Sequence, residues 1–407
     1  MIPPRPPEDA GEVPSFRAWD ARPVAERWAR YRSPAWRPIR LATRAGGGLL
    51  GGALGLVALR LVGWPLLRGL WLAGALVAMR WQGGPGVSHG SARWATRGEL
   101  AARRPRRGRA DLVVGRAGRR LVAIAEEEQY EHLLLVAPTG AGKTAGLIIP
   151  NLLAEPGTRS LVITDPKREL LRTTSPRLRQ VYGEAGVWVL DFLDPALSQG
   201  YNPLAAVADP ATADLFAQTW VANTGTSKEP FWDNAARALI AAAALHLVAT
   251  AETVPPLAGL VDFLCGQPAE AIGAALAASP APEVRRLARG FLANLAKTER
   301  LVGAVFAELP PRFAALHLPQ VRRTTALHEL DLAALAARPT ALYLALDLAY
   351  ARTLAPLTAC FFQDLFRTLA EVARARRDGA LPTAVLAYLD EFGTRWPTPP
   401  PSCAWPA

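Results

Sequence analysis

Apolar and polar positions form three successive patterns along this chain, and the first is a nearly unbroken apolar stretch from residue 45 to residue 79. A helix that crosses a membrane needs about 20 apolar residues. The stretch therefore predicts two short membrane helices that turn at residues 63–65. Arg60 and Arg68 flank this turn, so a hairpin would let both side chains reach the same membrane surface. A buried hairpin in a soluble core is the alternative interpretation.

Arginines cluster on both sides of the apolar stretch. They are Arg37, Arg40 and Arg44 before it and Arg80, Arg93 and Arg97 after it. Since positively charged flanks stay on the cytoplasmic side of a membrane, both ends of the hairpin are predicted to be cytoplasmic. The stretch starts too late in the chain and is too long for a cleavable signal.

The second pattern is a series of short, continuous apolar runs separated by helical stretches. The runs are Leu112–Val114, Leu121–Ile124, His132–Ala137, Ser160–Thr164, Val187–Leu190, Ala341–Leu346 and Ala384–Leu389. Continuous apolar runs are typical of strands buried on both faces. Alternation of such strands with helices favours a mostly parallel sheet, so the sequence predicts an α/β fold.

The third pattern fills residues 211–338, where apolar positions recur with helical spacing and no strand-like run occurs. The predicted helices cover residues 231–250, 257–265, 268–278, 283–297 and 299–309. This segment is interpreted as an all-helical domain inserted into the α/β domain. Trp220, Phe231 and Trp232 are expected to be core residues rather than site residues.

Composition narrows the class of protein. Half of the residues are apolar and a fifth are charged, which excludes wholesale disorder. A formal net charge of +11 favours contact with polyanions such as nucleic acid, nucleotides or anionic lipid. The arginine run at residues 103–107 is expected to bind anionic headgroups, with DNA contact as the alternative. Cys265, Cys360 and Cys403 lie far apart, which suggests neither a disulfide framework nor a zinc site.

A glycine-rich loop follows the predicted strand His132–Ala137 and precedes a helical stretch. Its residues are Pro138, Thr139, Gly140, Ala141, Gly142, Lys143 and Thr144. In this context the glycines let backbone N–H groups surround phosphates, and the helix start adds positive potential. Lys143 is predicted to reach the β and γ phosphates, and Thr144 to bind Mg²⁺. Ala137 stands where the motif has its first glycine, which is acceptable if its φ is negative.

Two consecutive acids, Asp390 and Glu391, end the last predicted strand. Asp390 is predicted to hold Mg²⁺ through its water shell, and Glu391 to polarise the attacking water. An ordinary polar strand end is the alternative. Asp165 and Lys167 also follow a strand, where open α/β sheets contact ligands. They could equally mark a helix start, with Pro166 in its first turn.

These pieces occur in an order that resembles the coupling proteins of bacterial conjugation and type IV secretion, the TraG/TraD class. The matching segments are HGSARWAT at 89–96, APTGAGKT at 137–144, IIPNLL at 148–153, ITDPKRE at 163–169, DF and DP at 191–195, YNPL at 201–204, FWDNAARALI at 231–240 and YLDEFG at 388–393. The N-terminal apolar stretch also fits. Together the segments span roughly residues 45–393.

The resemblance implies a RecA-like P-loop domain with an inserted all-α domain and an N-terminal transmembrane hairpin. It implies a hexameric ring at the cytoplasmic mouth of a type IV secretion channel in the bacterial inner membrane. Such proteins use ATP and Mg²⁺ to move single-stranded DNA with its attached relaxase, and sometimes effector proteins. By this resemblance Lys143 and Thr144 contact phosphate and Mg²⁺, Asp390 is the metal-side acid and Glu391 the catalytic acid.

The resulting division of the chain has six segments. They are an Arg/Pro-rich cytoplasmic tail (1–44), the hairpin (45–80), the first part of the nucleotide-binding domain (81–210), the inserted helical domain (211–338), the second part of the nucleotide-binding domain (339–393) and a Pro-rich tail (394–407). The last segment departs from the family pattern, because its prolines can continue neither a helix nor a central strand. A truncated or frameshifted product is the expectation there.

Three functions compete. The first is an ATP-driven DNA translocase anchored in the inner membrane. The second is a truncated, non-catalytic membrane fragment that binds nucleotide and acts at most as a docking module. The third is a related motor for chromosome or plasmid partitioning, against which the HGSARWAT and YNPL segments argue.

Overall fold

The computed structural model describes residues 95–138, 140–225, 230–295 and 299–391. They divide into two compact units. The smaller unit comprises the described part of residues 1–102 together with Arg116–Arg120, and the larger unit comprises Arg103–Gly115 and the described residues from Leu121 onward.

The smaller unit contains helix α5 (Arg97–Ala102) and the turn between strands β1 (Leu112–Ala117) and β2 (Arg120–Ile124). The hydroxyl of Thr96 accepts a hydrogen bond from Glu99 N at 3.3 Å, and the Glu99 carboxylate accepts one from Thr96 N at 2.6 Å. This reciprocal capping satisfies two N–H groups at the helix start.

A parallel sheet forms the centre of the larger unit. Its strands are β3 (Ser160–Asp165), β4 (Val187–Asp191), β5 (Ala341–Ala345) and β6 (Val385–Leu389). Within the described residues the strand order is β4-β5-β3-β6, and every neighbouring pair is parallel. These four strands agree with the predicted ones to within one residue at each end, and they confirm the predicted α/β class with a parallel sheet.

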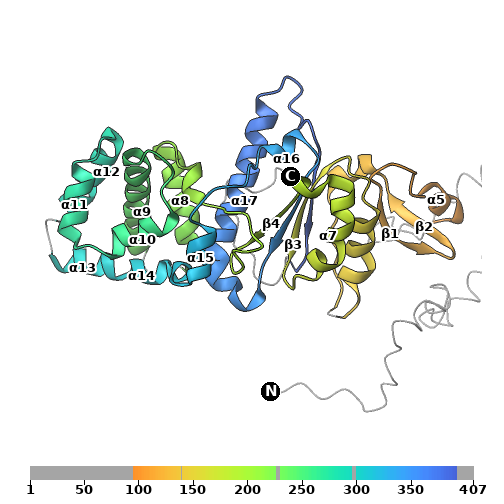
Figure 1. The fold of residues 1–407 in the computed structure, drawn as a ribbon, viewed down its shortest axis with the longest axis horizontal. Helices are drawn as coiled ribbons and strands as arrows, with labels where there is room; N and C mark the ends of the chain where they lie inside the picture. The colour runs from red at the N-terminus through yellow and green to blue at the C-terminus, as the bar shows by residue number, and fades with distance from the viewer. Residues whose placement is uncertain (1–94, 139, 226–229, 296–298, 392–407) are drawn as a thin grey trace, which may run out of the picture. The chain divides into compact units, whose positions relative to one another are not determined.

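Side chains of β3 alternate between two apolar cores, because successive residues of a strand point to opposite faces. Val162 joins the core that contains α17 (Ala351–Arg374). Leu161 and Ile163 join the core that contains α7 (Glu169–Tyr182). Figure 1 shows α7 and α17 on opposite faces of the sheet. Both faces are therefore covered, as the continuous apolar runs predicted.

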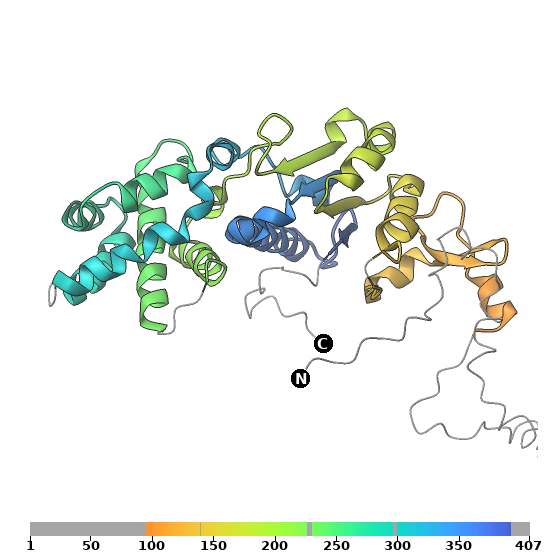
Figure 2. The same ribbon diagram turned by 90° about the horizontal axis from the view of Figure 1, so that it is seen from below.

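The chain between β4 and β5 is helical in the described residues (Figure 2). The longer helices are α8 (Pro210–Ala222), α9 (Pro230–Thr250), α10 (Leu257–Cys265), α11 (Ala269–Ala277), α12 (Pro282–Leu295) and α13 (Glu299–Ala307). Short helices follow: α14 (Leu309–Arg312), η6 (Ala314–His317), α15 (Pro319–Thr324) and α16 (Ala334–Ala337). The predicted helices are confirmed at nearly the predicted bounds.

Aromatic residues of this helical part differ in exposure. Trp220 is fully buried and its indole N–H donates to Arg312 O at 3.1 Å, so the prediction of a core residue is confirmed. Phe231 is 50% exposed, and Trp232 is only partly buried against it. The prediction that Phe231 is core was wrong, because it lies in the first turn of α9, beyond the part of that helix that its neighbours cover.

The YNPL segment connects this helical part to helix α17. The Tyr201 hydroxyl hydrogen-bonds Asp364 of α17 at 2.5 Å, and both side chains are buried. Asn202 caps the short helix η5 (Pro203–Ala206) and donates to Pro255 O at 2.8 Å. The motif residues therefore hold two distant parts of the chain together.

The apolar run His132–Ala137 is not a strand, which corrects the prediction. Leu134 and Val136 are 85% and 83% exposed, and Leu133 and Leu135 are also exposed. A strand needs a hydrogen-bonded partner, and within the described residues this segment pairs with no strand of the sheet. The local apolar pattern predicts burial but cannot supply that partner.

Several predictions fall on residues that the structure does not describe: the tail 1–44, the hairpin 45–80, the tail 394–407 and Thr139. Among the described residues, no helix has the length and the apolar character that crossing a membrane requires.

Candidate functional site

Two glycines of the phosphate loop, residues 138–144, have the left-handed backbone that such a loop requires. Gly140 and Gly142 both adopt a φ of +79°. A Cβ on Gly140 would meet no atom within 4 Å, so backbone conformation rather than space requires glycine there. Ala137 is not among the described non-glycine residues with positive φ, which are His132, Arg168 and Glu391.

The helix after the loop begins with one π-helical turn, η3 (Thr144–Ile148), and continues as α6 (Ile149–Ala154). Such turns occur frequently at functional sites. Lys143 stands at the junction, half-buried, and its ammonium donates to Ala137 O at 2.9 Å and Pro138 O at 3.4 Å. The positive charge of Lys143 thus lies over its own loop.

Asp390, at the carboxyl end of β6, meets the first residue of this helix. The Thr144 hydroxyl donates to Asp390 Oδ2 at 2.8 Å, and the backbone N–H of Glu391 donates to Asp390 Oδ1 at 3.0 Å. The Asp390 side chain is buried. The structure therefore brings together the two residues that the sequence nominates as metal ligands.

Glu391 follows Asp390 in a left-handed conformation, with a φ of +56°. This conformation is uncommon for a residue with a Cβ and stores strain of the kind found at functional sites. Glu391 therefore differs in backbone conformation from Asp390, which is not among the described residues with positive φ.

Asp165 caps a helix. Its carboxylate accepts hydrogen bonds from Glu169 N at 3.0 Å and Leu171 N at 2.7 Å, at the start of α7. Lys167 is exposed. The hydrogen bonds favour the helix-start interpretation of this segment over a role at the site edge, although α7 begins at Glu169, so Pro166 precedes the helix instead of lying in its first turn.

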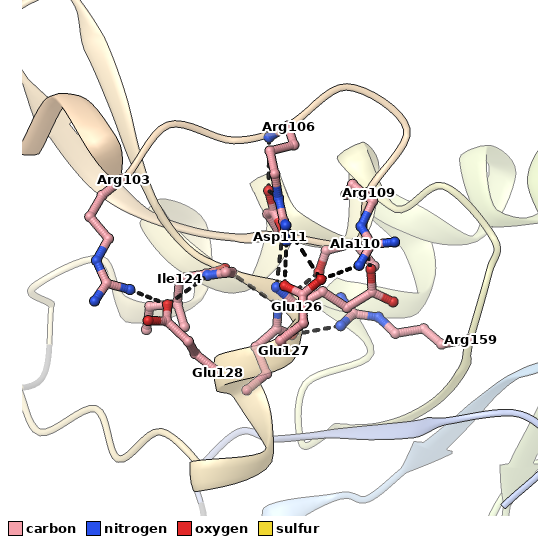
Figure 3. A network of polar contacts seen from close by, with 12 residues as sticks. Arg103, Arg106, Arg109, Ala110, Asp111, Ile124, Glu126, Glu127, Glu128 and Arg159 are labelled. Atoms are coloured by element: carbon pink, nitrogen blue, oxygen red, sulfur yellow. Dashed lines mark hydrogen bonds and ion pairs between the residues drawn. The ribbon is translucent and has the colours of Figure 1, made fainter.

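The arginine run 103–107 engages a group of acids (Figure 3). Arg103 pairs with Glu128. Arg106 contacts Asp111 and Glu127, each at 2.6 Å. These ion pairs lower the pKa of Asp111 and of Glu127 to about 2, chiefly through hydrogen bonds from Arg106.

Part of the run is therefore neutralised within the chain, which limits the predicted contact with headgroups or DNA. Arg109, just after the run, pairs with Glu126 at 3.2 Å and also with Glu127. Arg104 and Arg107 are exposed and form no ion pair with a described residue. The three consecutive glutamates of η2 (Glu126–Glu131) were the sequence signal for this pairing.

Two buried side chains connect this region to the helix after the phosphate loop. Asn151 of α6 accepts from Val113 N at 2.7 Å and donates to Val113 O and Leu147 O, each at 2.8 Å. Arg159 donates to Gln129 Oε1 at 2.6 Å and pairs with Glu155 at 2.9 Å. Sequence reasoning did not single out Asn151, although it lies inside the IIPNLL segment.

A glycine-rich loop leading into a helix, beside an acid that ends a parallel strand, defines a nucleotide-binding α/β protein of the phosphate-loop class. Residues 93–394 match the family model for type IV secretory system conjugative DNA transfer. The chain therefore belongs to this family, which confirms the resemblance to conjugative coupling proteins.

Individual relatives agree. The chain is 30% identical over 320 residues to Protein VirD4 of Agrobacterium fabrum, covering 75% of this chain and 46% of that protein. It is 31% identical over 153 residues to the conjugal transfer protein TraG of Escherichia coli, covering 35% of this chain and 23% of that protein. The chain thus spans less than half the length of these two relatives.

A solved structure shows the same fold. The plasmid coupling protein TrwB, in complex with the non-hydrolysable ATP analogue ADPNP, aligns with a TM-score of 0.50 at 17% identity. The alignment covers 75% of this chain and 74% of that chain.

Proposed function

We propose that this chain binds ATP with Mg²⁺ and hydrolyses it to drive DNA transfer as a type IV coupling protein. The observation that carries the proposal is the 2.8 Å hydrogen bond between Thr144 at the start of the phosphate-loop helix and Asp390 at the end of β6. It places the helix that follows the predicted phosphate loop beside a buried acid, the two elements that hold Mg²⁺ in nucleotidases of this class.

The donor set fits Mg²⁺, which prefers oxygen ligands and retains several waters. Thr144 would bind the ion through its hydroxyl and Asp390 through its carboxylate. The ion would neutralise the charge that develops on the phosphates. The direct bond between these two side chains keeps both oxygens at one place.

Phosphate binding falls to the loop itself. With Gly140 and Gly142 at positive φ, the backbone N–H groups of residues 140–144 can turn toward a phosphate. Lys143 exchanges its bonds to Ala137 O and Pro138 O for phosphate oxygens when nucleotide enters. Glu391 accepts a proton from the attacking water as general base.

Membership of the conjugative DNA transfer family supports a wider role. The motor would move single-stranded DNA with its relaxase, or an effector protein, into a type IV secretion channel. It would sit in the bacterial inner membrane by the hairpin 45–80, with the bulk of the chain in the cytoplasm, and work as a homo-hexamer. Residues 81–210 and 339–393 would form the nucleotide-binding domain, and 211–338 the inserted all-α domain.

A second candidate is a nucleotide-binding docking module without turnover. The exposed run Leu133–Val136 favours it, because the segment leading into the phosphate loop has no strand partner among the described residues. A loop that no paired strand precedes would bind nucleotide but hold it less rigidly for hydrolysis.

ATP hydrolysis by the full 407-residue chain, with and without single-stranded DNA, separates the two. The translocase predicts DNA-stimulated turnover that Glu391→Gln reduces about 100-fold or more, the range of general-base catalysis. The exposed Glu371→Gln is the matched control and leaves turnover unchanged. Nucleotide binding without turnover would support the docking module, and absence of both would contradict each candidate.

A further inference from the structure

Asp390 directly follows strand β6, whose pairing with its neighbour ends at Leu389. Within the described residues β6 pairs only with β3, and the last paired residues are Thr164 and Leu389. Asp390 therefore lies just past the end of a strand that is paired on one side. The final residues of such a strand fray unless other bonds hold them.

The side chain of Thr164 supplies those bonds. Its hydroxyl oxygen accepts a hydrogen bond from Asp390 N at 2.8 Å. The same oxygen lies 3.3 Å from Tyr388 O and 3.3 Å from Asp390 O, so its proton can be donated to either carbonyl. Thr164 is fully buried. A side-chain hydroxyl thus extends the β3–β6 pairing by one residue, to the residue that bears the carboxylate.

We propose that Thr164 is a positioning residue that fixes Asp390 for metal binding, an inference that rests on the proposed nucleotide function. Thr164 holds the backbone of Asp390, and the backbone sets where the carboxylate meets Thr144. Thr164 touches neither nucleotide nor metal in this account. It belongs to the ITDPKRE segment, whose acid Asp165 instead caps α7.

Thr164 needs its hydroxyl group, rather than its branched shape, to position Asp390. Thr164→Val keeps the branched shape but leaves the buried N–H of Asp390 without a partner, which a native structure tolerates poorly. Thr164→Ser keeps the hydroxyl and loses only a methyl group. The pair separates positioning from packing, because a packing role would make Ser at least as harmful as Val.

The experiment measures ADP binding to the full chain by calorimetry, as a function of Mg²⁺ concentration. Mg²⁺ is expected to strengthen ADP binding. In Thr164→Val, the Mg²⁺ concentration that gives half of this increase in affinity is expected to rise about tenfold, because one buried hydrogen bond is lost. Affinity for ADP without Mg²⁺ is expected to stay unchanged, and Thr164→Ser to respond as the wild type does. Thr174→Val is the matched control, because Thr174 is an equally buried threonine that bonds Tyr343 of β5.

The outcomes are distinct. A wild-type chain that binds no ADP contradicts the proposed function and the inference together. A wild type that responds to Mg²⁺, with Thr164→Val responding identically, overturns the inference alone. Circular dichroism verifies folding of each variant, and Thr164→Ala, which also lacks the hydroxyl, replaces Thr164→Val if that variant does not fold. An unchanged Mg²⁺ response of Thr164→Ala would overturn the inference equally.

Discussion

The hydroxyl of Thr144 donates a hydrogen bond to the carboxylate of Asp390 across 2.8 Å, although 246 positions separate the two residues. Thr144 begins the helix after the phosphate loop, and Asp390 directly follows strand β6. The bond shows that the fold brings two sequence motifs to one point at the carboxyl edge of the sheet. It also makes the roles of both residues testable by substitution.

Lys143→Ala is expected to lower nucleotide affinity at least about tenfold, because no other side chain of the loop is cationic and charge-assisted bonds to phosphate are the strong ones. Fluorescence titration with a labelled ATP analogue measures this. Lys167→Ala, an exposed lysine after β3, is the control and should bind as the wild type does. Equal affinity in Lys143→Ala and wild type would remove Lys143 from the site.

Asn151→Leu is expected to destabilise the fold by about 2–4 kcal/mol, because it leaves the partly buried N–H and C=O of Val113 without their partner. Chemical denaturation monitored by circular dichroism measures the loss. Asn223→Leu is the comparison, since Asn223 is less buried and bonds Thr219 O of its own helix. Similar stability of Asn151→Leu and wild type would contradict the role of Asn151 as a clamp.

Asp364 predicts a specific pH dependence of stability. Burial raises its pKa from 3.8 to about 6, against the opposing effects of the Tyr201 hydrogen bond and Arg367. A carboxyl group whose folded pKa is raised stabilises the fold least when ionised. Its contribution is therefore favourable below about pH 4 and is lost as the pH rises to about 6, by on the order of 3 kcal/mol.

Asp364→Asn should remove this loss, since an amide oxygen can still accept from the Tyr201 hydroxyl. The variant is expected to match the wild type at pH 4 and to exceed its stability at pH 8. Denaturant midpoints across pH 4–8 measure both chains. Parallel pH profiles of variant and wild type would show that Asp364 does not titrate in this range.

Arg106→Gln is expected to lower the unfolding temperature, because Arg106 contacts Asp111 and Glu127 together (Figure 3). Differential scanning calorimetry compares it with Arg104→Gln, which changes an exposed arginine that pairs with no described residue. Equal unfolding temperatures for the two variants would mean that the acids around Arg106 do not stabilise the fold.

Local sequence patterns predicted most of this fold, because the spacing of apolar residues along a segment reflects the secondary structure and the burial of that same segment. The continuous apolar runs of β3 and β5 and the 3.6-residue spacing of α9 each identify their element. The run His132–Ala137 has the same pattern but no partner within the described residues, and partners depend on the rest of the sheet. The apolar pattern alone could not distinguish the paired strands β3 and β5 from the run His132–Ala137.

The site was predicted to the level of residue type and order, but its supporting contacts were not. Glycines at positive φ and an acid after a strand are visible in the sequence. The bond from Thr164 to Asp390 depends on which strands are neighbours, and that is set by topology. The pairing of Arg106 with Glu127 likewise depends on how the intervening hairpin folds.

Binding of a non-hydrolysable ATP analogue, with and without Mg²⁺, tests the central claim most directly. Wild type is compared with Asp390→Asn and with the exposed acid variant Asp378→Asn. The account predicts that Mg²⁺ strengthens binding to wild type and Asp378→Asn but has little effect on Asp390→Asn, which retains only its Mg²⁺-free affinity. The same Mg²⁺ enhancement in all three chains would contradict a metal site at Thr144 and Asp390.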